Sequence, residues 1–135
     1  MAGVQSKPAG TISRPAARDL SDNQYHAAAI ASDEEFDYGD SSAGTTVLGV
    51  LQNAPEAQGE VAEIATEGTS LLVVDGNSVN IAAGDPLGSN SNYHGVKVTT
   101  DNAQYFCIAL EPSTADGDLI EVKLLGPRYL GVDAE

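Results

Sequence analysis

The sequence is poor in aromatic, basic and sulfur-containing residues. Its 135 residues include no tryptophan, two phenylalanines, five tyrosines, one cysteine and six lysines and arginines in total. A lone cysteine excludes an internal disulfide and a CxxC zinc site, and it fits assembly in a reducing cytoplasm. No apolar run reaches the ~18 residues that a membrane span requires, and the N-terminus lacks the apolar core of a signal peptide.

The few basic residues are also unevenly placed. The net charge is −14, and binding to nucleic acid or to an anionic membrane needs clustered lysine and arginine, so we expect neither partner. Lys7, Arg14 and Arg18 all precede the first acidic residue, so residues 1–18 carry +3, whereas residues 19–135, with three bases and twenty acids, carry −17. A basic segment on an acidic body can dock on an acidic neighbour, and we predict these three residues as partner-binding; the alternative is a disordered start with solvated charges.

The first third of the chain lacks a clear strand pattern. Residues 1–22 are low in large apolar side chains and contain two prolines, which favours an extended arm rather than a packed element. Residues 23–45 form a linking segment in which 25–31 is either a strand or a turn of helix. Residues 32–45 are acidic and rich in turn residues, so we expect an exposed loop anchored by Phe36 and Tyr38.

From residue 46 the pattern is typical of β-structure. About seven short strands are predicted, at 46–51, 60–66, 70–74, 78–82, 96–99, 104–110 and 119–125. Asp75-Gly76 predicts a tight hairpin, and Gly126-Pro127 is expected to end the last strand. Residues 46–127 are therefore predicted to be an all-β domain, a small β-barrel or β-sandwich of the β-tulip or β-clip kind, and residues 128–135 a C-terminal tail.

The side-chain patterns of two of these strands predict burial of different numbers of faces. Residues 104–110 are almost continuously apolar, as in a strand covered on both faces. Residues 119–125 alternate, with Ile120, Val122 and Leu124 on one face and Glu121 and Lys123 on the other. A core of small aliphatic side chains gives a small stability margin, so we expect oligomerisation, docking on a partner, or both.

The sequence shows no reactive constellation. It contains no phosphate loop, no HExxH and no dinucleotide fingerprint. His94 is read as a solvated or hydrogen-bonded loop histidine, and Cys107 as a buried, inert thiol. Gly39-Asp40-Ser41 superficially resembles a serine-protease nucleophile segment, but the following residues and the chain length do not fit. We therefore predict no enzyme, no catalytic residue and no cofactor.

A cation site in the acidic loop is the remaining chemical alternative. An EF-hand loop counted from Asp33 would need glycine at its sixth position and glutamate at its twelfth, where the chain has Tyr38 and Gly44. The pattern fails, so a solvated acidic loop is favoured over a weak cation site, and no metal is predicted.

Three blocks resemble one known family. Residues 49–61 read GVLQNAPEAQGEV, residues 81–87 read IAAGDPL, and residues 107–127 read CIALEPSTADGDLIEVKLLGP. In this order and spacing the blocks resemble the capsid cement, or head decoration, proteins of bacteriophages. The resemblance implies a structural virion protein on the outer capsid surface, commonly a homotrimer, that clamps neighbouring major capsid protein subunits. It does not cover the first 45 or so residues, whose role it leaves open.

Other functions follow less directly. The AGDP turn is similar to turns of β-clip domains that bind sugars, so a carbohydrate-binding β-clip module is the alternative function, and a small hydrolase is a third. For the capsid-binding function, we hypothesise that residues 1–22 reach a neighbouring subunit and add a strand or an ion-paired strap.

Overall fold

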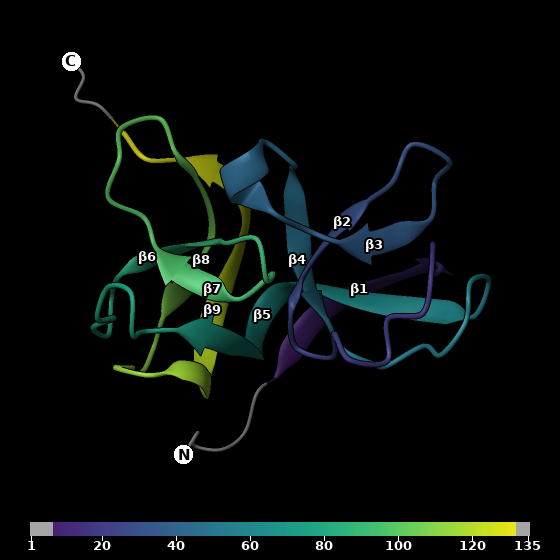
Figure 1. Ribbon diagram of the computed structural model, residues 1–135, viewed down its shortest axis with the longest axis horizontal. Coiled ribbons are helices and arrows are strands. Elements are labelled where there is room, and N and C mark those ends of the chain that lie inside the picture. Colours follow the sequence, from purple (N-terminus) through teal and green to yellow (C-terminus); the bar gives the residue numbers. More distant parts are fainter. Residues whose placement is uncertain (1–6, 132–135) are drawn as a thin grey trace.

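The computed structural model describes residues 7–131 and is almost entirely β-structure (Figure 1). The strands are β1 Pro8–Pro15, β2 Ala27–Ile30, β3 Phe36–Tyr38, β4 Val47–Leu51, β5 Val61–Asp75, β6 Pro86–Ser89, β7 Gly95–Lys97, β8 Gln104–Ala109 and β9 Asp116–Tyr129. Within the described range the one helical element is a single 3-10 turn, η1, at Ser41–Ala43. The prediction of an all-β fold is confirmed.

The long strand β5 is shared by two lobes. In the N-terminal lobe, the first half of β5 pairs with β1 on one edge and β4 on the other, and the order continues through β2 to β3. A parallel bridge from Ala16 to Phe36 links the chain after β1 back to β3. In the C-terminal lobe, the pairings run β5–β7–β6–β8–β9, and β9 returns to β5. Each lobe is thus nearly ring-shaped, and the molecule as a whole is not one clean barrel (Figure 1).

Each lobe encloses its own core. The smaller cluster, in the N-terminal lobe, consists of Ala16, Leu20, Ala28, Phe36, Leu51, Ala62 and Ile64. The larger cluster is centred on the C-terminal lobe and includes Leu72, Val74, Leu87, Phe106, Cys107, Ile120, Val122 and Leu124. Phe36 and Phe106 are both fully buried, so the only two phenylalanines of the chain each fill one lobe.

The prediction of two strands at 60–66 and 70–74 is corrected, because they are one strand. Gly68 lies between the two predicted strands, but it adopts φ +83° inside β5, beside a register irregularity with β1. A glycine in this conformation bends the strand without breaking it. The strand continues because residues on both sides of the bend have pairing partners, β1 and β4 before it and β9 after it.

The predicted hairpin at Asp75-Gly76 is wrong. The Asp75 carboxylate instead accepts hydrogen bonds from the backbone N–H groups of Asn77 and Ser78, which forms a local turn. Gly76 does not have the positive φ of a type I′ turn; it is glycine because a Cβ there would overlap the Ser113 carbonyl. The predicted strand at 78–82 is reduced to an isolated bridge between Ile81 and Ser113, and the next strand, β6, begins at Pro86.

The predicted end of the last strand is also wrong. Gly126 adopts φ +79° and marks an irregularity in the β8–β9 pairing, after which β9 continues to Tyr129. The alternation predicted in this strand is confirmed, since Ile120, Val122 and Leu124 are buried whereas Lys123 is exposed.

The N-terminal third is more ordered than its pattern predicts. Residues 8–15 are extended but pair with β5, and Ala16 and Leu20 are fully buried. The prediction that residues 1–22 form an unpacked arm is therefore wrong for residues 8–20. Residues 1–6 lie outside the described range. The open choice at 25–31 is resolved as strand β2. The acidic segment contains a short strand, β3, and Phe36 anchors it as expected.

Candidate interaction surface

Of the three predicted partner-binding residues, Arg14 lies in β1, and Lys7 and Arg18 lie just before and after it. Lys7 precedes this strand, and its backbone exchanges hydrogen bonds with Thr69. At the other end, Arg14 Nη1 lies 3.6 Å from Glu34 Oε1, and Arg18 Nη2 lies 2.8 Å from Asp37 Oδ2. The structure therefore brings Arg14 and Arg18 together against the acidic segment of their own chain and leaves Lys7 apart.

The two arginines are held with different strength. The Arg14 and Glu34 side chains are 47% and 79% exposed, and ion pairs of this kind contribute only about 0.2–1 kcal/mol. Arg18 also lies over the Tyr38 ring, 4.7 Å from its centroid, and its hydrogen bond to the largely buried Asp37 raises the pKa of the guanidinium. Arg14 can exchange its carboxylate for that of a partner at little cost, whereas Arg18 is part of the fold.

Strand β1 offers its side chains to solvent. Seven of its eight residues are exposed and the eighth is half-buried. Among the described strands β1 pairs only with β5, so its second edge carries unpaired backbone groups apart from the bridge that follows at Ala16. An exposed edge of this kind is a template for another strand.

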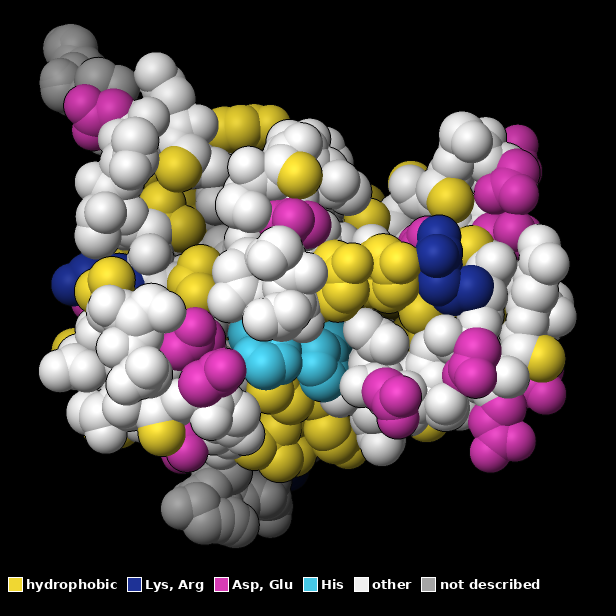
Figure 2. Space-filling model, in the orientation of Figure 1, with side chains coloured by type: hydrophobic (Ala, Val, Ile, Leu, Met, Phe, Trp, Pro, Cys, Tyr) yellow, Lys and Arg dark blue, Asp and Glu magenta, His cyan; other side chains and the backbone are white. Residues whose placement is uncertain are grey.

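A second cluster joins the two lobes at their junction. Tyr38 of β3 and Tyr93 of the β6–β7 loop are stacked with ring centroids 4.0 Å apart, and burial raises the Tyr93 pKa. Close by, the rings of His26 and His94 lie 5.0 Å apart, and Figure 2 shows them side by side near the centre of one face. Neither pair could be predicted from the sequence, because their members are more than fifty residues apart and only the fold brings them together.

The two histidines have different surroundings. His94 Nδ1 lies 2.8 Å from Asp116 Oδ1, so the prediction of a hydrogen-bonded loop histidine is confirmed. His26 Nδ1 is 3.1 Å from the carbonyl oxygen of Gln24, and burial, together with the nearby His94, lowers the His26 pKa. Within residues 7–131, no group of three or more histidine, cysteine or acidic side chains is placed to hold a metal ion.

The acidic segment uses its carboxylates for local structure. Asp40 caps η1 by accepting hydrogen bonds from the backbone N–H and the hydroxyl of Ser42. Asp37 accepts from Arg18 through one oxygen and from the Tyr38 backbone N–H through the other. These contacts give the acidic residues at these two positions a role in local structure.

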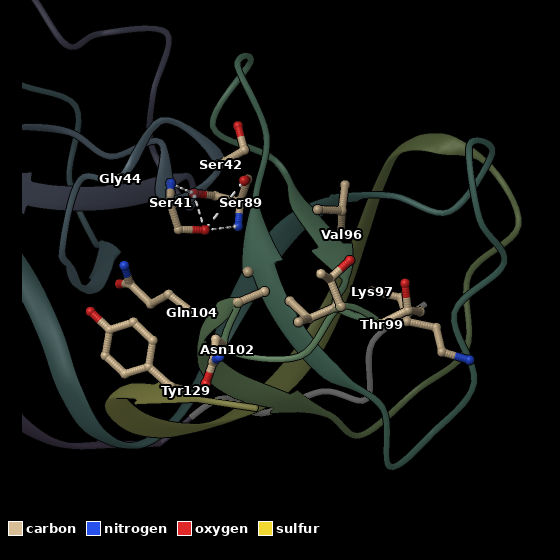
Figure 3. A pocket seen from close by; sticks show the side chains of 14 residues that line it. Ser41, Ser42, Gly44, Ser89, Val96, Lys97, Thr99, Asn102, Gln104 and Tyr129 are labelled. Atoms are coloured by element: carbon tan, nitrogen blue, oxygen red, sulfur yellow. Dashed lines mark hydrogen bonds between the residues drawn. The ribbon is translucent and has the colours of Figure 1, made fainter. Parts of the chain in front are cut away.

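A cavity of about 430 Å³ lies where η1 faces the C-terminal lobe (Figure 3). Ser41 and Ser89 hydrogen-bond to one another at its upper wall, and Gln104 accepts from the backbone N–H of Val47 at 2.7 Å. Lys97 is the only charged residue of the lining, and its ammonium group lies 3.6 Å from Asp85. The polar groups of this cavity therefore fasten the lobes together.

Cys107 is fully buried in β8, and burial raises the pKa of its thiol well above the usual 9.0. A thiol with a raised pKa is a poor nucleophile at neutral pH. The prediction that Cys107 is buried is confirmed, and its setting is that of a core side chain.

Among the described residues, no helix is long or apolar enough to cross a membrane.

The motif residues of 49–61 serve the strand pairing. A Cβ on Gly49 would overlap the Ala65 carbonyl, so only glycine lets β4 approach β5 at this point. The Gln52 amide donates to the buried Ser70 hydroxyl, and the Asn53 amide bonds to both Val61 and Glu63 of β5. These side chains tie the chain after β4 to β5.

The Gly84-Asp85-Pro86 turn has a similar structural role. Gly84 adopts φ +97°, and the Asp85 carboxylate accepts a hydrogen bond from the Ala82 backbone N–H at 2.8 Å. Backbone hydrogen bonds from this turn to Ala109 attach it to the end of β8. The three sequence blocks are thus explained mainly by the fold that they specify.

The comparison with protein families gives one match. A family model described as phage cement protein matches residues 18–124, which is well over half of the chain. No curated protein matches the sequence. The match begins at Arg18 and so includes the acidic segment, the junction cluster, the first two sequence blocks and the third as far as residue 124, but not β1.

Proposed function

Because this chain belongs to the phage cement protein family, a family with a structural role on capsids, we propose that it binds the outer surface of a bacteriophage head and stabilises contacts between major capsid protein subunits. The family match over residues 18–124 is the observation that carries this proposal. We further propose that the protein acts as a homotrimer and is assembled in the host cytoplasm, and that it has no catalytic role.

Physical considerations support a clip of this kind. A protein that spans the boundary between two shell subunits adds contact area to each, and several linked copies gain avidity without a tight single contact. The chain is strongly acidic, with a net charge of −14, so charge repulsion opposes non-specific aggregation of the free protein.

The segment at 1–22 is the proposed strap to the neighbouring subunit. Its strand β1 presents exposed side chains and a free edge. Within the described residues Lys7 forms no ion pair, and Arg14 forms only a weak one with Glu34. Both features favour exchange of internal contacts for contacts with acidic groups of a capsid subunit.

Co-sedimentation with heads that lack the protein tests the proposal. We expect the purified chain to pellet with such heads at a fixed ratio to the major capsid protein, and to raise the temperature at which the heads release DNA. A chain that stays in the supernatant over a broad range of concentration would contradict capsid binding. Binding to immobilised glycans instead would support the carbohydrate-binding alternative.

The strap is tested by neutralising its charges without truncating the core. Deletion of residues 1–22 would remove the buried Leu20, so the better variant is Lys7→Gln/Arg14→Gln, with Arg128→Gln, an exposed residue near the end of β9, as the control. We expect head binding of the double variant to weaken by about tenfold, corresponding to roughly 1.4 kcal/mol, and the control to bind normally. Equal binding by all three proteins would reject the role of the strap.

A further inference from the structure

The outward face of the C-terminal lobe carries an unusual number of aliphatic side chains. The strand register places the outward residues in three rows. The first two rows each run from β8 or the residue after it, through β9, to β5: Ile108, Lys123 and Thr69, then Leu110, Glu121 and Leu71. The third row has Leu119 on β9 beside Val73 on β5. The residues between these rows, such as Ser70, Ala109 and Val122, point inward and are fully buried. We call the outward set the β5–β9–β8 face.

These aliphatic side chains are only partly covered by the rest of the chain. Leu110 and Leu119 are 44% and 40% exposed, and Leu71, Val73 and Ile108 are half-buried. A strand whose side chains are apolar on both faces of its sheet is normally covered on both faces. Residues 70–74 and 104–110 have this pattern, but within residues 7–131 only their inner face is fully covered.

The charge of this face differs from that of the molecule. Its two charged residues, Glu121 and Lys123, have opposite signs, so the face is neutral on a chain of net charge −14. Lys123 is exposed and forms no ion pair within the described residues; its ammonium group donates only to the Leu124 carbonyl. Two strongly acidic molecules can approach closely only through surfaces where charge is balanced or complementary.

We infer that the β5–β9–β8 face is the surface through which copies of this chain contact one another. A second copy is the occupant that the charges favour, because the face is neutral, its unpaired lysine meets an excess of carboxylates on any other copy, and Lys123 of one copy can pair with Glu121 of the next. The inference rests on the self-association within the proposed function and is independent of capsid binding.

The mass of the full-length chain in solution tests this inference. Analytical ultracentrifugation is expected to show an oligomer for the unaltered protein and a shift toward monomer for Leu119→Glu, with a dissociation constant at least about tenfold higher. Val61→Glu is the matched control, because Val61 is also an outward residue of a sheet, is 59% exposed and receives the same charge in the N-terminal lobe. Both substitutions are at exposed positions, and unchanged thermal unfolding at low concentration establishes that the variants are folded.

A charge exchange tests the proposed ion pair between copies. Lys123→Glu and Glu121→Lys are each expected to weaken the oligomer, and the double variant to restore it in part. A monomeric unaltered protein, or an oligomer that Leu119→Glu leaves intact, would overturn the inference. A monomer whose head binding is lost in Leu119→Glu would also overturn it and would assign the face to the capsid instead. Because the ultracentrifuge measurement contains no heads, failure of self-association and failure of capsid binding are separate results.

Discussion

The two halves of β5 present opposite surfaces to solvent, although they belong to one strand. Before the bend at Gly68, the outward residues include Val61, Glu63 and Glu67, which are all exposed, and two of the three are acidic. After the bend, the outward residues are Leu71 and Val73, which are half-buried. A continuous strand can thus give each lobe a different kind of neighbour while keeping the lobes mechanically linked.

The lobes are closed in similar ways but differ in the edge that they leave open. A single parallel residue pair closes each ring: Val74 with Gly95 in the C-terminal lobe, and Ala16 with Phe36 in the N-terminal lobe. Among the described strands, however, β1 pairs only with β5, whereas β9 pairs with both β5 and β8. The proposed capsid strap thus belongs to the lobe with an open strand edge, and the proposed self-contact to a face whose central strand is paired on both sides.

Removal of either phenylalanine is expected to have the largest effect. Phe36→Ala and Phe106→Ala each leave a cavity in one lobe and should lower the free energy of unfolding by about 3–5 kcal/mol. Because β5 passes through both cores, calorimetry is expected to show one unfolding transition in each variant. Two separate transitions, with only the mutated lobe shifted, would break the account of coupled lobes.

A methyl group at Gly49 is expected to be nearly as damaging. Gly49→Ala places a Cβ against the Ala65 carbonyl and forces β4 away from β5, at a cost of about 2–3 kcal/mol. Gly131→Ala, where nothing lies within 4 Å of the added atom, is the control and should unfold at the same urea concentration as the unaltered chain. Equal stability of the two variants would show that the strands can separate freely here.

Acidification is expected to weaken the junction between the lobes. Burial lowers the His26 pKa below its ordinary 6.5, so the unfolded chain binds more protons than the folded chain just below that pH. Stability is therefore complete above about pH 6.5 and falls as the pH drops toward the lowered pKa. Thermal midpoints between about pH 7.5 and 5.5 should decline less in His26→Gln than in the unaltered protein, and parallel curves would refute this assignment.

The arginine pairs should give the smallest effects. Arg14→Gln is expected to change stability by less than about 0.5 kcal/mol, because its ion pair is exposed. Arg18→Gln should cost about 1 kcal/mol, since it loses both the Asp37 hydrogen bond and the contact with the Tyr38 ring. Urea titrations measure both, and a larger loss for Arg14→Gln would reverse the distinction between a strap residue and a fold residue.

Sequence reasoning succeeded where the signal is local and failed where it depends on distant partners. The alternation of Ile120, Val122 and Leu124 reports a strand with one buried face without knowledge of the neighbouring strands. At Asp75-Gly76 the same turn chemistry allows a hairpin or a side-chain-capped turn, and the nearby 113–115 segment decides between them. Gly68 and Gly126 resembled strand ends in the sequence, because a bend within a strand and a turn at its end both favour glycine with a positive φ.

The surfaces show the same limit. The basic character of residues 7–18 was predictable from Lys7, Arg14 and Arg18, but the ion pairs of the two arginines with Glu34 and Asp37 were not. The apolar pattern of residues 104–110 predicted coverage on two faces, whereas the fold of this chain supplies full coverage of one. Only the structure identifies which side chains are left for a partner.

The most direct test of the central claim is a density map of purified virions. We expect protrusions on the outer surface of the shell, at local three-fold positions, into which copies of this two-lobed fold can be placed with their β5–β9–β8 faces in mutual contact. Virions whose outer surface is bare, and from which mass spectrometry detects no peptide of this chain, would contradict the account.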